Sequence, residues 1–149
     1  RETFVVAEIA EEAHPWKVQH DLENFQVWLR SRFIPTEDSE GLLKMLGNVK
    51  DGAVKTAVDD GFSQEVEVRI GASLKGSDRP KNPIMLQPYR TFREVEQPMS
   101  ECVVRLYSNS AGLPKVALFE SDGGAWRLEA VQKIVRYLSE NLAGWTVIG

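Results

Sequence analysis

The chain of 149 residues has a single cysteine and two histidines, and this scarcity argues against several classes of chemistry. Cys102 cannot form a disulfide within the chain, and a lone cysteine in an alternating apolar segment is typical of a small core residue. A zinc site needs three or four ligands, and no cysteine cluster stands ready to complete one around His14 and His20. The same two histidines would have to serve any Ser-His-Asp triad, and no nucleophile-elbow motif accompanies them. We therefore expect no metal and no cofactor, and enzymatic activity is disfavoured.

Long apolar runs and a strong charge of one sign are also absent. The apolar runs are a few residues long, too short to cross the ~30 Å hydrocarbon core of a membrane, and no secretory signal is visible. A formal charge of −4, from 18 basic and 22 acidic residues, argues against a protein that coats polyanions. These features predict a single soluble domain, residues 1–149, in a reducing cytoplasm. Because the chain begins with Arg1, we expect it to be a fragment of a longer one.

The N-terminal third predicts one strand followed by two helices. Residues 3–9 have the composition of a strand. Asp21 is a suitable N-cap for a helix over residues 22–33. A shorter helix over residues 41–46 follows a group of capping residues, with Gly47 placed to end it. Two helices joined by so few residues predict a helical hairpin over one face of a sheet.

From the middle of the chain the apolar period changes to two, which predicts strands. An antiparallel hairpin is expected over residues 53–70, turned by Asp59-Asp60-Gly61. Residues 71–82 are polar and contain glycine, which predicts a loop. The short apolar stretch at residues 84–86 lies between prolines, which favours a strand near a sheet edge. Further strands are predicted over residues 99–107, 114–120 and 145–148.

A long amphipathic helix is predicted over residues 125–142. Its apolar residues recur at steps of three and four and are Leu128, Val131, Val135, Leu138 and Leu142. We expect this stripe to be buried against the sheet and Trp126 to anchor the first turn. The preceding Asp122-Gly123-Gly124 lacks a phosphate-binding glycine pattern, so we interpret it as a turn and acidic cap. The predicted fold is α+β, an antiparallel sheet of about five to seven strands packed by the long C-terminal helix and the N-terminal pair of shorter helices.

The most unusual stretch is residues 79–93, which has four cations, no acid and two aromatic rings in an acidic protein. Cations that neutralise phosphates and rings that stack on bases are the requirements of a site for single-stranded nucleic acid. The candidate binding residues are Arg79, Lys81, Tyr89, Arg90, Phe92 and Arg93. Two other interpretations stay open: a proline-rich edge whose rings point inward and whose cations are solvated, and an edge that docks a protein.

A fainter pattern is formed by Asp59, Asp60 and Glu67, which resemble the carboxylates that share a Mg²⁺ ion in metal-dependent nucleases. Those enzymes carry a lysine where this chain has Arg69, and a guanidinium cannot deprotonate. We interpret the aspartates as turn residues and Glu67 as part of the solvated face of the hairpin.

The segments Pro88-Tyr89-Arg90 and residues 118–126, in this order of elements, resemble uncharacterised phage and prophage proteins of the YfdQ type over about the last two-thirds of the chain. Members of that family are longer and have no established activity, so the resemblance assigns no functional residue. It implies an intracellular protein of phage or prophage origin. The leading hypothesis is a non-enzymatic accessory protein that acts through homo-oligomeric or host-protein contacts. The alternatives are a single-stranded nucleic-acid-binding or recombination accessory protein and a divergent Mg²⁺-dependent nuclease.

Overall fold

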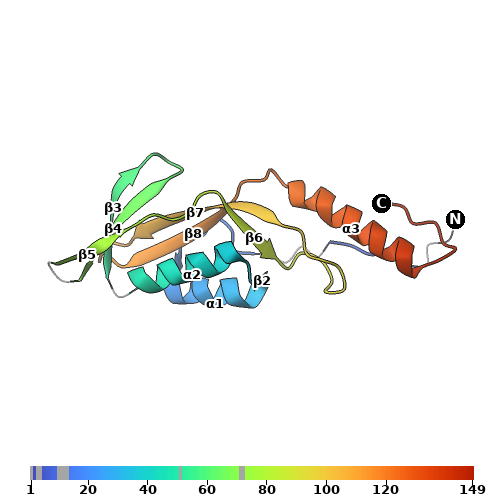
Figure 1. Ribbon diagram of the computed structural model, residues 1–149, viewed down its shortest axis with the longest axis horizontal. Coiled ribbons are helices and arrows are strands. Elements are labelled where there is room, and N and C mark those ends of the chain that lie inside the picture. Colours follow the sequence, from blue (N-terminus) through green and yellow to red (C-terminus); the bar gives the residue numbers. More distant parts are fainter. Residues whose placement is uncertain (1, 3–4, 10–13, 51, 71–72) are drawn as a thin grey trace.

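The structure, a computed structural model, describes residues 2, 5–9, 14–50, 52–70 and 73–149 (Figure 1). In chain order these residues form β1 (His20–Asp21), α1 (Leu22–Arg32), β2 (Phe33–Ile34), α2 (Glu37–Val49), β3 (Ala53–Asp59), β4 (Gln64–Ile70), β5 (Ser73–Asp78), β6 (Ile84–Pro88), β7 (Ser100–Ser108), β8 (Pro114–Glu120) and α3 (Ala125–Asn141). The strands make a five-stranded sheet of order β1-β8-β7-β6-β2 and a three-stranded sheet of order β3-β4-β5, antiparallel throughout. The predicted α+β class is confirmed, with the strands divided between two sheets.

The core lies between the five-stranded sheet and the helices α1 and α2, which lie side by side over one of its faces (Figure 1). Along β7 the side chains of Cys102, Val104 and Leu106 are buried, whereas those between them are only partly covered. This alternation is that of a strand with one face on the core. From the helices, Phe25, Leu29 and Leu46 are among the largest side chains that are fully buried.

Both predicted N-terminal helices are present, and their starts are set by local hydrogen bonds. The Asp21 carboxylate accepts a hydrogen bond from the backbone N–H of Asn24 at 2.8 Å, as expected of an N-cap. Thr36 and Ser39 form a reciprocal capping box at the start of α2. The prediction that Gly47 ends this helix is wrong, because α2 continues to Val49. Gly47 inside the helix costs ~1 kcal/mol, and the complete burial of the Val49 side chain offsets that cost.

The predicted hairpin is confirmed as β3 and β4, paired with Val54 opposite Val68. The Asp60 carboxylate accepts hydrogen bonds from the N–H groups of Phe62 and Ser63, at 2.9 and 2.6 Å, and so shapes the turn. The predicted loop over residues 71–82 is wrong for residues 73–78, which form β5 on the free side of β4; residues 71–72 lie outside the described chain. Ladder hydrogen bonds use the backbone, so a polar segment can supply a strand.

The strands predicted at the two ends of the chain are absent from the described residues. Residues 5–9 and 145–148 have no regular structure and lie alongside α3 (Figure 1); residues 3–4 lie outside the described chain. These apolar segments cover part of a helix instead of extending a sheet.

The long C-terminal helix is present as predicted, and its position explains this arrangement. α3 extends beyond the end of the five-stranded sheet (Figure 1) and contributes no residue to the core cluster. Its buried residues are Trp126, Ala130 and Ile134, a stripe at steps of four. The predicted burial of a stripe against the sheet is wrong, because none of its five residues is buried and Leu128 is 66% exposed; the stripe is Leu128, Val131, Val135, Leu138 and Leu142. Trp126 does anchor the first turn, and it does so on a loop and not on the sheet.

Candidate interaction surface

Residues 89–99 connect β6 to β7, and the side chain of Gln97 bonds to the backbone of this segment, which we call the crossover loop. The Gln97 side chain is buried, and its Oε1 accepts the backbone N–H groups of Arg90 and Thr91 at 2.8 and 3.0 Å. Its Nε2 donates to the carbonyl groups of Phe92 and Val95, both at 3.1 Å. A single side chain thus replaces the hydrogen bonds that regular structure would give these backbone groups. The loop is therefore a rigid platform.

Arg90 lies on this platform and joins it to α3. Its guanidinium carbon lies 4.0 Å from the ring centroid of Trp126 and 5.3 Å from that of Trp16. Its Nη2 donates to the hydroxyl of Ser100 at 3.0 Å and to the carboxylate of Glu120. The two rings and the carboxylate compensate for burying the cation, which is 5% exposed. Arg90 therefore connects the sheet, the segment before β1 that contains Trp16, and α3.

Other loop residues continue this contact along the helix. The rings of Phe92 and Tyr137 meet edge to face with centroids 5.6 Å apart. The Nζ of Lys133 lies 3.5 Å from a carboxylate oxygen of Glu96. Together with Arg90, these residues hold α3 against the crossover loop.

The remaining candidate residues for nucleic acid have partners of their own. Arg79 pairs with Glu65 on β4 and Lys81 pairs with Asp38 on α2, each at 2.6 Å. The Arg93 guanidinium lies over the ring of Tyr89 at 5.0 Å. Of the six candidates, Arg90 and Phe92 make internal contacts, Arg79 and Lys81 form exposed ion pairs, and the exposed Arg93 lies over Tyr89. They do not come together as one cationic stacking surface.

The acidic candidates also have structural partners. Asp59 forms an ion pair with Arg105 on β7, and the hydrogen bond from that guanidinium lowers the pKa of the Asp59 carboxyl. Glu67 lies 3.4 Å from Arg69, next but one on the same strand. Asp60 binds the turn amides, which lower its pKa. Within the described residues, no group of three or more acidic, histidine or cysteine side chains is arranged to hold a metal ion.

The side chains of both histidines contact neighbouring groups, and the side chain of the cysteine is buried. His14 lies with Nε2 at 3.3 Å from the carbonyl oxygen of Tyr89, and His20 stacks on the ring of Trp28. Cys102 is fully buried, as predicted, and burial raises the pKa of its thiol to about 12. A thiol with that pKa is a poor nucleophile near neutral pH.

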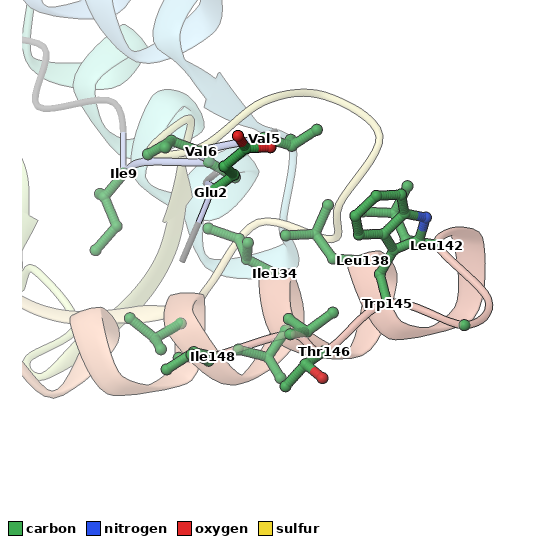
Figure 2. A pocket seen from close by; sticks show the side chains of 16 residues that line it. Glu2, Val5, Val6, Ile9, Ile134, Leu138, Leu142, Trp145, Thr146 and Ile148 are labelled. Atoms are coloured by element: carbon green, nitrogen blue, oxygen red, sulfur yellow. The ribbon is translucent and has the colours of Figure 1, made fainter.

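A hollow lies on a part of the molecule that we call the arm, defined as α3 with residues 2, 5–9 and 142–149. A cavity of about 860 Å³ opens between these three segments, and Figure 2 shows their aliphatic side chains turned toward it. Val135 and Leu138 of α3 line one side, and Val5 and Val6 line another. The C-terminal residues lie close to the helix, since a Cβ added to Gly149 would be 2.4 Å from Val135 Cγ2.

Exposed apolar side chains are concentrated on the arm. Eleven large apolar side chains are exposed among the described residues, and five belong to the arm: Val5, Val6, Leu128, Trp145 and Ile148. The other six are spread over β6, α1, the β3–β4 hairpin and three connecting segments. Scattered exposed apolar residues are normal, whereas a cluster around one helix marks an interaction surface. The arm is therefore the candidate functional site.

Comparison with known proteins adds no assignment, since no protein-family model, curated protein or solved structure matches the chain. Among the helices of the described residues, none combines the length and the apolar character needed to span a membrane.

Proposed function

We propose that this is a non-enzymatic interaction protein that associates with further copies of itself through the arm. The proposal rests on the cluster of exposed apolar side chains around α3, a helix that contributes no residue to the core cluster. α1 and α2 supply the core with its helical cover, and α3 adds nothing to it. A two-fold contact requires only one self-complementary surface on each copy. Origin in a phage or prophage stays a prediction from sequence resemblance.

The two alternative functions have less support. Binding of single-stranded nucleic acid through residues 79–93 would need accessible cations and rings, yet Arg90 is buried and Phe92 packs on Tyr137. A Mg²⁺-dependent nuclease would need Asp59 free to bind the ion, yet this carboxylate is paired with Arg105. Two of the three exposed cations of the stretch, Arg79 and Lys81, face acidic side chains that would have to be displaced, whereas the third, Arg93, lies over the ring of Tyr89.

Sedimentation equilibrium over a range of protein concentrations tests the proposal. The wild-type protein should show a mass that rises above that of the monomer as concentration increases. The double variant Leu128→Asp with Ile148→Asp should stay monomeric, because each change places a charge in the apolar contact. Val27→Asp is the matched control, since this exposed valine lies on α1, away from the arm. A wild-type protein that is monomeric at every concentration reached, or a control that loses association as fully as the double variant, would refute the proposal.

A further inference from the structure

The exposed face of α3 carries a row of side chains at steps of four, three and four. The row consists of Leu128, Gln132, Val135 and Ser139; Val135 is partly covered and the others are exposed. Residues with this spacing lie on one side of an α-helix and can meet a second helix along its length. Over 17 residues, at 1.5 Å each, α3 is about 26 Å long.

Two opposite charges flank this row on the same side of the helix. Glu129 and Arg136 are seven residues apart, which is two turns, so both lie along one border of the row. Within its own chain Glu129 lies 2.8 Å from Lys133, which also approaches Glu96 on the crossover loop. No ion pair among the described residues involves Arg136. The border thus presents a negative charge toward the start of α3 and a positive charge toward its end.

We propose that two copies associate through α3 in an antiparallel arrangement, with Glu129 of each copy beside Arg136 of the other. This inference rests on the proposed self-association and specifies its geometry. An antiparallel pair brings the same border of both helices together and reverses the order of its charges. With the two-fold axis near Lys133, both opposite-charge pairs form.

A parallel arrangement is disfavoured by the same charges. In a parallel pair, the border of each helix that carries Glu129 and Arg136 would face the opposite border of the other helix, which carries Val131 and Leu138, so neither charge would gain an opposite partner. Specific interfaces usually bury about 1,200 Å² or more, which is large for one pair of short helices. Trp145 and Ile148, exposed beside α3, are placed to add to the contact. We therefore expect a dimer whose formation depends on protein concentration.

Charge reversal tests this geometry. Glu129→Arg and Arg136→Glu should each weaken self-association about tenfold, because each places like charges at both symmetric contacts. An equimolar mixture of the two single variants should associate as a heterodimer about as tightly as the wild type, since each reversed charge then faces an opposite one. The double variant in one chain should also regain association. Sedimentation equilibrium of each protein and of the mixture provides the measurement.

The matched controls are Glu40→Arg and Lys44→Glu, which reverse two exposed charges one turn apart on α2 and should change nothing, alone or mixed. Circular dichroism checks the helix, because Glu129→Arg also removes the contact with Lys133. A weakened helix could not produce recovery upon mixing. Single variants that associate as the wild type does, or a mixture no tighter than its components, would overturn the antiparallel pairing. If Leu128→Asp with Ile148→Asp still abolished association in that case, self-association through the arm would stand without this geometry; a monomeric wild type would refute both.

Discussion

The five-stranded sheet with α1 and α2 forms what we call the body of the protein. The body and the arm differ in how far their edges and faces are covered. On the body, residues before α1 cover the outer edge of β8, where Lys17 donates to the carbonyl of Leu118 at 2.9 Å. The other edge is covered by β2 and by Asp38, whose carboxylate accepts the N–H of Met85 at 2.7 Å. Free edges invite unwanted pairing, and these two contacts protect the edges of the sheet. The arm, in contrast, leaves apolar side chains in solvent.

Because of this difference, we expect the body to supply most of the folding stability and the arm to supply the proposed interaction surface. The core of the body buries whole aliphatic and aromatic side chains, each worth roughly 1.5–3 kcal/mol in transfer free energy. The arm buries three side chains of α3, Trp126, Ala130 and Ile134. Its other attachments are the contact of Arg90 with Trp126, one edge-to-face ring pair and one ion pair, which contribute about 0.5–2 kcal/mol each. The arm should therefore open at lower free energy than the body, and substitutions in the two regions should have different effects.

The largest expected effect lies in the body. Phe25→Ala should lower the free energy of unfolding by about 3–5 kcal/mol, because it empties a fully buried site between α1 and the sheet. Leu128→Ala on the arm should change it by no more than about 0.5 kcal/mol. Urea denaturation of the monomer, at concentrations too low for association, measures both. Equal losses in the free energy of unfolding at the two positions would contradict the distinction between body and arm, because α3 would then belong to the same cooperative core.

An intermediate effect is expected at the joint between the regions. Gln97→Ala leaves the backbone N–H groups of Arg90 and Thr91 without their acceptor, at a cost of about 1–3 kcal/mol for each buried group. Because the crossover loop carries α3, hydrogen exchange of the α3 amides should become faster than that of β7 and β8. Glu140→Ala, at an exposed position of α3 outside the row proposed to meet a second copy, is the matched control and should leave exchange unchanged. Uniform acceleration throughout the chain would show that the arm has no separate opening.

Sequence patterns predicted the parts of this fold that depend on neighbouring residues. The cap at Asp21 and the turn at Asp60 are made by side chains bonding to amides two or three residues away, so the local sequence was sufficient. β5 was missed because its side chains are polar and its pairing with β4 uses the backbone.

The arm was missed because α3 carries two apolar stripes. One contains Trp126, Ala130 and Ile134, and the other contains Val135 and Leu138. Periodicity shows both and does not tell which of them faces the body. Arg90 was assigned to the surface because arginine usually lies there. Its burial depends on Trp16 and Trp126, residues far apart in the sequence, and the four tryptophans were the signal available for such a site.

The smallest expected effect concerns the β3–β4 hairpin, which is a second element attached to the body. Gln64 is buried and exchanges hydrogen bonds with the backbone of Leu106, at 2.8 and 3.0 Å, so the hairpin is tied to the body much as Gln97 ties the crossover loop. Val54, Val66 and Val68 of the hairpin also belong to the core cluster, and the ion pair of Asp59 with Arg105 lies nearer the tip. The hydrogen bond from Arg105 lowers the pKa of Asp59 from its ordinary value of 3.8, and the amide of Gly61 acts in the same direction.

A lowered pKa in the folded state means that the unfolded state binds the proton more readily. The stabilisation is therefore present above pH 3.8 and is lost as the pH falls below that value through the lowered pKa of the folded protein. Amide exchange near the tip of the hairpin should become faster over this range, while the Gln64 tie keeps the base of the hairpin protected. Asp59→Asn should remove this acid dependence, because its amide cannot titrate. If the variant kept the same dependence, Asp60, whose pKa the turn amides also lower, would be the group responsible. Because neither carboxylate lies on the arm, exchange of the α3 amides should show no matching change, so the acid sensitivity should be confined to the tip of the hairpin.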